Sequence, residues 1–230
     1  MRQAERPIVI AIDGPAGSGK SSTAKAVAAQ MGYRHLDSGA FYRTITLAAL
    51  EAGIAAERWP SLTFEELRAL GVESTPTEKG YALSIRGEPV GDRIRSPEVN
   101  ANVSRMAAVP AVRDWLMEAL RAAGRDGGLV ADGRDIGTVV FPEADLKLFL
   151  VCDPPERARR RLKQEGKETA DESTLEEEVQ RLVARDRQDE GRETAPLVQA
   201  EDAVVLDTTA LSFEGQVAEI ARLAKSRISA

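Results

Sequence analysis

The segment Gly14–Ser21 most constrains what this chain can fold into. It reads Gly-Pro-Ala-Gly-Ser-Gly-Lys-Ser and directly follows the apolar run Ile8–Ile12, so it matches the phosphate-binding loop pattern G-x-x-x-x-G-K-[ST] behind a predicted strand. Glycines let backbone N–H groups approach phosphates closely, and Lys20 supplies a cation for the outer phosphates. In a glycine-rich turn without a ligand, packing alone would not require a lysine at this position. We therefore expect the loop to hold the phosphates of a nucleotide.

A helix is predicted directly after the loop. Ala24, Val27, Ala28 and Met31 recur at i, i+3, i+4 and i+7, and Gly32 marks the expected helix end. The loop amides then lie at a helix N-terminus, where partial positive charge favours an anion. We expect nucleotide contacts from Gly14, Pro15, Ala16, Gly17, Ser18, Gly19, Lys20, Ser21 and Ser22, with the Ser21 hydroxyl offered to Mg²⁺.

Alternating strand and helix patterns predict an α/β fold with a doubly wound, five-stranded parallel sheet. The five apolar runs that predict strands are Ile8–Ile12, Arg34–Leu36, Leu129–Ala131, Lys147–Val151 and Ala203–Leu206. A chain of 230 residues with 43% apolar content suits one domain, residues 1–230, with an insert.

Two segments depart from the alternation. Residues 61–97 contain Tyr81, Leu83 and Ile85 in strict alternation before a turn, which predicts a small antiparallel piece in an inserted lobe. Helices are expected next, over 99–108 and 111–123. Residues 154–192 are highly charged, and they are either solvated helix faces or a lid that brings arginines over a transferring phosphate.

Composition excludes several classes of partner. The formal net charge of −6 argues against a generic polyanion binder, so we expect no nucleic-acid partner. No apolar stretch reaches the roughly 18 to 20 residues that cross a bilayer, and Met1–Arg6 lacks the features of a signal peptide. The single cysteine, Cys152, can form no internal disulfide, which fits a reducing compartment. We expect a cytoplasmic protein without a membrane partner.

Charged residues gather where the predicted strands end, which is the edge where doubly wound sheets bind ligands. Asp132 ends one such run, and it is either a helix cap or a water-mediated Mg²⁺ contact. Ser38 is expected to cap the helix that starts near Ala40. Arginines that could neutralise a moving phosphoryl group come from separate segments: Arg43, Arg113, Arg134, Arg185 and Arg192. The absence of Asn-Lys-x-Asp weakens a GTPase reading.

Four segments together closely resemble the bacterial cytidylate kinases, a family of P-loop nucleoside monophosphate kinases. They are Asp13–Lys20, Leu36–Arg43 (Leu-Asp-Ser-Gly-Ala-Phe-Tyr-Arg), Ala131–Pro142 (with Gly-Arg-Asp-Ile-Gly) and Arg185–Arg192. The resemblance spans nearly the whole chain, and it implies a fold of the P-loop kinase type with an inserted monophosphate-binding lobe. It also implies transfer of the γ-phosphoryl group of ATP to CMP or dCMP, with Mg²⁺ as cofactor.

The resemblance also implies roles for single residues. Lys20, Arg134 and Arg192 would act on the transferring phosphate, and Ser21 with Asp132 would hold the metal. The CMP site would comprise Ser38, Arg43 and Arg134 at the α-phosphate, Ser104, Arg113 and Asp135 at the cytosine, and Arg185 and Asp189 at the sugar. Gln188 stands where some members carry another arginine, which leaves one less positive charge near the sugar.

Two other functions stay open on sequence alone. The chain could be a P-loop kinase for another small acceptor, such as a different nucleotide or a shikimate-like alcohol, or a regulatory nucleotide-binding module that transfers nothing. His35, Trp59 and Trp115 are expected to be structural. We expect a monomer, because the enzyme would close around two substrates.

Overall fold

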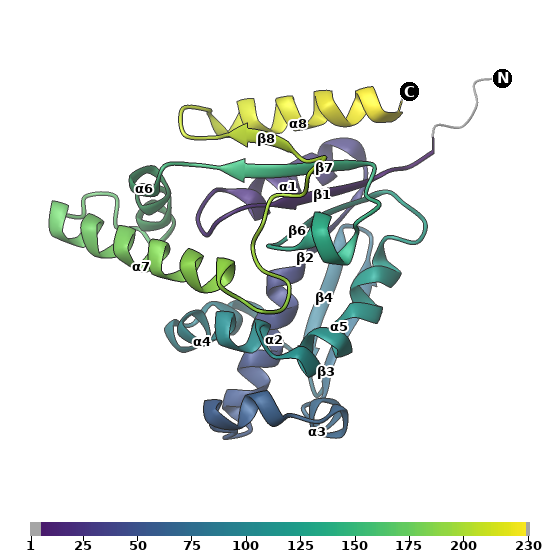
Figure 1. Ribbon diagram of the computed structural model, residues 1–230, viewed down its shortest axis with the longest axis vertical. Helices are drawn as coiled ribbons and strands as arrows, with labels where there is room; N and C mark the ends of the chain where they lie inside the picture. Colours follow the sequence, from purple (N-terminus) through teal and green to yellow (C-terminus); the bar gives the residue numbers. More distant parts are fainter. Residues whose placement is uncertain (1–5, 229–230) are drawn as a thin grey trace.

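A parallel sheet of five strands forms the centre of the structure, a computed structural model that describes residues 6–228. The strands run in the order β2-β6-β1-β7-β8 (Figure 1). Their bounds are Val9–Asp13 for β1, Arg34–Asp37 for β2, Leu129–Asp132 for β6, Leu146–Val151 for β7 and Val204–Asp207 for β8. Each begins or ends within one residue of its predicted run. The predicted α/β fold with a doubly wound parallel sheet is confirmed.

Helices cover both faces of this sheet, because neighbouring strand residues point to opposite sides. Ile10 and Ile12 pack on one side with α1 (Lys20–Met31) and α8 (Phe213–Ile228), whereas Ala11 joins the core on the other side. That second core is closed by three helices, α2 (Ser38–Glu51), α4 (Pro97–Ala107) and α5 (Pro110–Ala123). As predicted, α1 ends before Gly32, which takes a left-handed conformation with φ of 68°.

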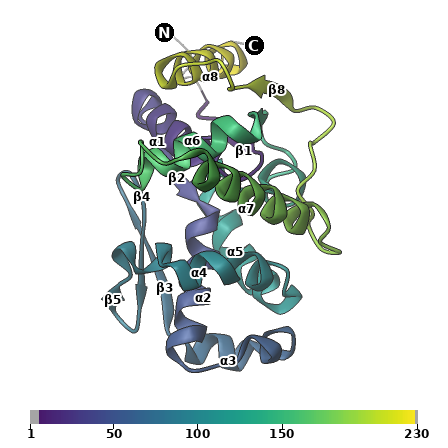
Figure 2. The same cartoon turned by 90° about the vertical axis from the view of Figure 1, so that its left-hand side faces the viewer.

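A smaller antiparallel sheet interrupts this alternation, as the pattern around Tyr81 predicted. It contains β3 (Val72–Thr77), β4 (Gly80–Ile85) and β5 (Glu88–Pro89), and short helical segments flank it: η1 (Ala56–Ser61), α3 (Phe64–Ala69) and η2 (Gly91–Arg95). Figure 2 shows β3 and β4 as a long hairpin beside α2. The tip of this hairpin reaches back to the main sheet, because the Lys79 carbonyl accepts a hydrogen bond of 3.1 Å from the backbone N–H of His35.

The helices α6 (Pro154–Gln164) and α7 (Glu172–Glu190) pack against each other and project from one side of the sheet (Figure 1, left). Both hold the backbone of Ala16 in the phosphate-binding loop. Asp186 accepts a hydrogen bond of 2.8 Å from the Ala16 N–H, and Arg157 donates one of 2.8 Å to the Ala16 carbonyl. Arg157 and Asp186 also form a buried ion pair with each other. The base of the helix pair is thus fixed to the loop.

The expected packing roles of the tryptophans fit the structure. Trp59 is fully buried and donates its indole N–H to the Ile54 carbonyl at 3.0 Å, while Trp115 packs against the same core.

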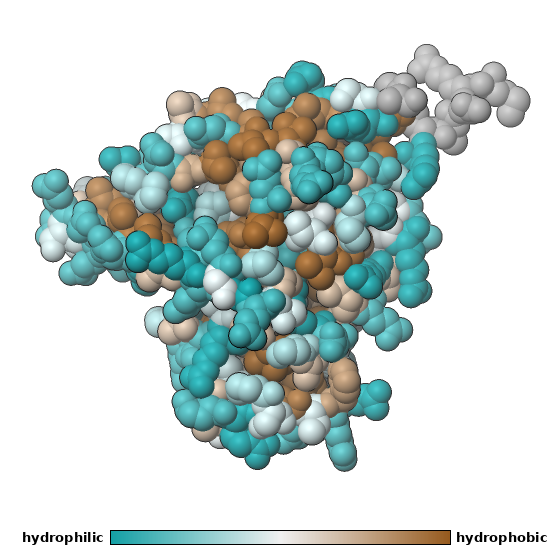
Figure 3. Space-filling model, in the orientation of Figure 1, coloured by the Kyte–Doolittle hydropathy of each residue, from teal (hydrophilic) through white to brown (hydrophobic). Residues whose placement is uncertain are grey.

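Figure 3 shows a mostly hydrophilic face with apolar surface over β8 and the start of α8, where Val205, Leu211 and Phe213 are exposed. Among residues 6–228, no helix is both long enough and apolar enough to cross a membrane.

Candidate active site

The phosphate-binding loop joins β1 to α1 at the carboxyl edge of the sheet. Gly17 and Gly19 take positive φ values of 74° and 88°, which residues with a Cβ rarely adopt. Gly14 serves a different purpose, since a Cβ there would lie 2.2 Å from the Leu150 carbonyl oxygen of β7. The loop amides therefore surround the first turn of α1, the geometry that binds phosphates.

Lys20 is the first residue of α1, and its side chain turns back over the loop. Its Nζ donates to the Pro15 carbonyl at 2.6 Å, and only 5% of the residue is exposed. Burial, together with the positive charge of Arg134, holds the pKa of Lys20 well below its usual value. An anion placed beside Lys20 would compensate this buried cation, as the outer phosphates of a nucleotide do.

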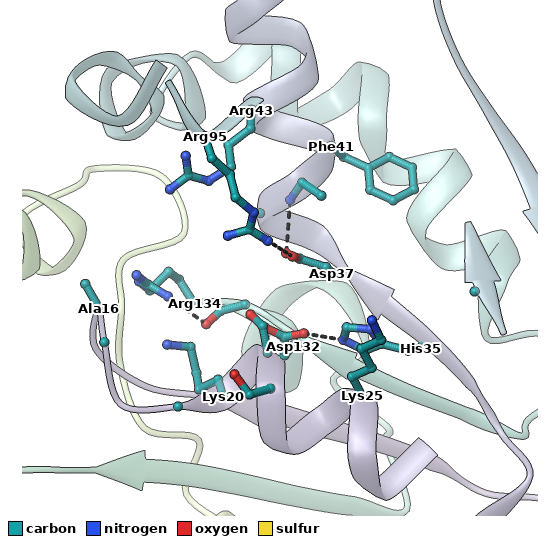
Figure 4. Close-up of a pocket in the computed structure, with 18 of the residues that line it drawn as sticks. Ala16, Lys20, Lys25, His35, Asp37, Phe41, Arg43, Arg95, Asp132 and Arg134 are labelled. Atoms are coloured by element: carbon teal, nitrogen blue, oxygen red, sulfur yellow. Dashed lines mark hydrogen bonds and ion pairs between the residues drawn. The ribbon is translucent and has the colours of Figure 1, made fainter. Parts of the chain in front are cut away.

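A cavity of about 660 Å³ opens over the loop (Figure 4). Ten predicted site residues line it: Ala16, Gly17, Gly19, Lys20, Ser21, Ser22, Arg43, Asp132, Arg134 and Arg185. Gly133, which was not predicted, also lines it. Its far wall is the inserted hairpin, including Lys79 and Tyr81. The cavity is therefore long enough to connect the loop with α2 and the inserted segment.

Positive charge exceeds negative charge along this cavity. Burial is the largest cause that lowers the pKa of Arg43 to about 9, and the positive charges of Arg185 and Arg95 lower it further. Burial and the charge of Arg134 lower the pKa of Arg185 to about 10. These guanidinium groups repel one another while each remains a cation at neutral pH. Such a cluster is stabilised by a bound dianion, and arginine forks suit phosphate oxygens.

Ser21 and Asp132 meet at the floor of the cavity. The Ser21 hydroxyl donates to Asp132 Oδ2 at 2.5 Å, and Asp132 caps no helix, which removes one of its two expected roles. A hydroxyl and a carboxylate are the hard oxygen ligands that Mg²⁺ takes, usually with substrate phosphates and water completing its shell. Within residues 6–228, no three histidine, cysteine or carboxylate side chains form a metal cage. The pair therefore suits a nucleotide-bound Mg²⁺.

Asp189 is the centre of a buried network beside the cavity. It accepts hydrogen bonds from Ser104 Oγ at 3.0 Å and Arg134 Nε at 2.8 Å, and it forms an ion pair with Arg192. Burial favours the neutral carboxyl, but the charges of Arg134, Arg192 and Arg185 lower the pKa of Asp189 below its usual value. Four predicted site residues thus come together, although only Arg134 among these partners lines the open cavity.

Arg113 and Asp135, the predicted cytosine readers, lie deeper still. They form an ion pair with side chains 3% and 5% exposed, and neither lines the cavity. The Arg113 guanidinium also stands 5.5 Å from the centre of the Tyr42 ring. The Tyr42 hydroxyl is buried and has no hydrogen-bond partner among residues 6–228. Tyr42 is thus a polar group at this site that the sequence analysis did not assign.

The helix α2 begins differently from the prediction. Asp37 is its capping residue, with Oδ1 accepting from the Ala40 N–H at 3.0 Å, whereas Ser38 lies inside the first turn. The expected capping role of Ser38 is therefore wrong. Its hydroxyl instead donates to the Asp132 carbonyl at 2.9 Å and is buried. This close approach requires Gly133, since a Cβ there would lie 2.4 Å from the Ser38 hydroxyl.

His35 is the clearest residue that the sequence analysis missed, because it was expected to be structural only. Its Nε2 lies 2.7 Å from Asp132 Oδ1, and it lines the cavity with Asp37 (Figure 4). One sequence signal could have found it: His35 lies two residues before Asp37, so both side chains share one face of β2. The pairing of Asp37 with Asp132, which places that face beside Asp132, is seen only in the structure. Asp13 was also missed, and it joins the loop to the segment after Arg134.

Comparison with known proteins agrees with this geometry. The cytidylate kinase family profile matches residues 10–226. A cytidylate kinase of an Exiguobacterium species is 46% identical over 219 residues, which cover 95% of this chain and 97% of the relative. Cytidylate kinases of a Geobacter species and of Chlorobaculum tepidum are 43% and 44% identical, covering 98% and 93% of this chain and 96% and 91% of their own length. This chain therefore belongs to the cytidylate kinase family.

Proposed function

We propose that this protein transfers the γ-phosphoryl group of ATP to CMP or dCMP, giving ADP and CDP or dCDP. The observation that carries the proposal is one cavity in which a phosphate-binding loop faces several crowded cations, namely Lys20, Arg43, Arg134 and Arg185. Two phosphate-bearing substrates that meet end to end would relieve that crowding. Membership of the cytidylate kinase family supports CMP as the acceptor.

Direct in-line transfer needs positioning and charge neutralisation rather than covalent catalysis. Backbone N–H groups within the loop Gly14–Ser22 hold the ATP phosphates, and Lys20 places its ammonium on the outer phosphates. Arg134 and Arg192 neutralise the charge that moves with the phosphoryl group. No general base is assigned, because the acceptor is a phosphate oxygen that is already ionised near neutral pH.

The acceptor site combines residues that already contact other polar groups of the protein. Ser38, Arg43 and Arg134 bind the α-phosphate of CMP, and Arg185 with Asp189 binds the sugar. Ser104, Arg113 and Asp135 read the cytosine. Since Arg134 and Asp189 are already paired at 2.8 Å, and Arg113 is paired with Asp135, acceptor binding exchanges partners within a preformed polar network rather than exposing new charges.

We assign Mg²⁺ to the oxygens of Ser21 and Asp132, the latter through water. When bound, the ion neutralises charge on the ATP phosphates. Residues 61–97 form part of the inserted monophosphate-binding lobe of the single domain 1–230, and residues 154–192 form the lid. The protein acts as a cytoplasmic monomer on its two nucleotides, without nucleic-acid or membrane partners.

A coupled assay of ADP formation over a panel of acceptors tests this function. CMP and dCMP should be the preferred acceptors, with UMP slower and shikimate-like alcohols inactive. A higher kcat/KM for another acceptor would replace CMP in the proposal. Intact ATP binding without any diphosphate product, over the whole panel, would instead favour a regulatory nucleotide-binding module.

A further inference from the structure

His35 and Ser21 hold the two oxygens of Asp132 from opposite sides. His35 Nε2 lies 2.7 Å from Oδ1, and the Ser21 hydroxyl lies 2.5 Å from Oδ2. The Asp132 side chain is 3% exposed and that of His35 is 14% exposed, so little water competes for either contact. A carboxylate held at both oxygens has one orientation, and here that orientation points Oδ2 toward the phosphate-binding loop.

The backbone of His35 is itself fixed from two directions. On one side, β2 pairs with β6, and His35 lies opposite Val130 in that register. On the other side, the hairpin tip approaches so closely that a Cβ at Gly80 would lie 2.5 Å from the His35 carbonyl oxygen. The neighbouring Lys79 carbonyl accepts the His35 N–H at 3.1 Å. Contacts with the inserted hairpin therefore help to fix the position of the His35 backbone.

We propose that His35 is a positioning residue that orients Asp132 toward a nucleotide-bound divalent cation and connects this carboxylate to the inserted hairpin. The inference rests on the proposed function, because it takes Asp132 as the carboxylate that faces the metal. His35 Nε2–H donates to Oδ1, which leaves Oδ2 to the Ser21 hydroxyl and to the cation or its water. Partners of this kind, one step removed from the metal, typically change metal affinity by about 10- to 100-fold.

The test compares binding of Mg·ADP with binding of ADP in EDTA, measured by calorimetry on the whole protein. His35→Leu should weaken Mg·ADP binding by about 10-fold and leave metal-free ADP binding within about twofold, because the loop amides and Lys20 remain. His35→Gln should restore most of the Mg·ADP affinity, since a carboxamide N–H can reach Asp132. Gln30→Leu, an exposed change on α1 that does not line the cavity, should bind Mg·ADP as the wild type does.

Gly80→Ala provides a second variant that leaves the His35 side chain intact. Its new Cβ displaces the hairpin tip or the His35 backbone, so it should weaken Mg·ADP binding in the same selective way. Thr75→Ala, an exposed change on β3, is its control.

Two results would overturn the inference: wild-type Mg·ADP affinity in both His35→Leu and Gly80→Ala, or equal losses with and without the metal. If His35→Leu does not fold, Gly80→Ala decides alone. Because ADP binding involves no acceptor, these results stay separate from a failure of the CMP assignment in the acceptor panel.

Discussion

Arg113 and Asp135 form an ion pair that is buried beside the cavity rather than open to it. Burial outweighs the stabilising charge of Arg113 and raises the pKa of Asp135 above its usual value. Removing one member of such a pair leaves a buried, uncompensated charge, which costs about 3–5 kcal/mol of stability. The groups of this pair nonetheless match cytosine, because a carboxylate accepts from the exocyclic amine and a guanidinium donates to the ring acceptors.

Replacing Asp135 with asparagine should relax the choice between CMP and UMP. A carboxamide can accept from the cytosine amine but can also donate to the uracil oxygen, so the discrimination against uracil disappears. We expect the CMP to UMP ratio of kcat/KM to narrow by about 10-fold or more, equivalent to ~1–3 kcal/mol for a lost readout contact. The comparison requires both acceptors at one ATP concentration.

Thermal unfolding of Asp135→Asn separates specificity from damage to the loop. If kcat/KM falls by the same factor for CMP and UMP, Asp135 only supports its loop and the base is read elsewhere. Asp135→Ala is the harsher variant, because it leaves Arg113 without its partner, and it should lower the melting temperature more.

Replacing Lys20 with alanine should lower kcat by about 10²-fold or more, because the lost ammonium acts where charge develops in the transition state. The fold should persist, since within residues 6–228 the hydrogen bonds of the Lys20 amine go to the Pro15 carbonyl and the Ser18 hydroxyl of its own loop. Lys225→Ala, an exposed change on α8 outside the cavity, is the matched control. A kcat within about threefold of the wild type, or ~0.65 kcal/mol, would contradict the role of Lys20.

The ionisation of Asp13 should be visible in the NMR shifts of two backbone amides that donate hydrogen bonds to it. Its carboxyl oxygens accept hydrogen bonds from the backbone N–H groups of Ile136 at 2.8 Å and Gly137 at 2.7 Å. Burial outweighs these donors and raises the pKa of Asp13 to about 7, with the nearby charge of Asp135 adding to the effect. The amide ¹H shifts of Ile136 and Gly137 should therefore titrate with a midpoint near 7, and Asp13→Asn should abolish the titration.

The stability contribution of Asp13 has a defined sign. The pKa of Asp13 is 3.8 in the unfolded state and about 7 in the folded state, so between these pH values the folded state binds more protons. The contribution of Asp13 to the free energy of unfolding is therefore fully present below pH 3.8 and is lost as the pH rises through 7. In Asp13→Asn this slope should disappear from the unfolding free energy measured across the same pH range. Amides of constant shift across neutral pH would show that the carboxyl stays ionised.

The sheet was predictable because its strands are local signals. Runs such as Ile8–Ile12 are short, apolar and bounded by charged or glycine residues, and periodicity alone identifies them. The phosphate-binding loop was equally predictable, since its function depends on contiguous residues. Which strands become neighbours is different, because the order β2-β6-β1-β7-β8 depends on long-range packing that no local window contains.

The sequence predicted a set of site residues but not the contacts between their side chains. Sequence separates Asp132 from Ser21 by 111 residues, and nothing local indicates that their side chains meet. His35 was read as structural because its partner lies on a neighbouring strand. Gln188, which was expected to leave one less positive charge near the sugar, is exposed on α7 and does not line the cavity.

The segment 154–192, which we propose as a lid, contains parts with different contacts. Residues 154–192 were expected to be either solvated helix faces or a lid, but Arg157 fits neither, because it is buried and paired with Asp186, and both hold Ala16. Arg161 and Arg185, by contrast, line the cavity. We therefore predict that closure pivots about Ala16 rather than carrying the whole helix pair.

Hydrogen exchange should resolve this pivot. When an ATP analogue and CMP bind together, amides from Gly166 to Leu182 should gain protection, because closure brings the connection between α6 and α7 and the first half of α7 over the substrates. Ala16 and Arg157 should already be protected without ligands and change little. Asp186→Asn weakens the hold on Ala16, so exchange across both helices should accelerate even in the free protein, while Arg187→Gln, an exposed change next to it, should not. Protection that rises evenly over 154–192 would mean that the helix pair moves as one body, and unchanged exchange would leave an ordinary solvated helix pair.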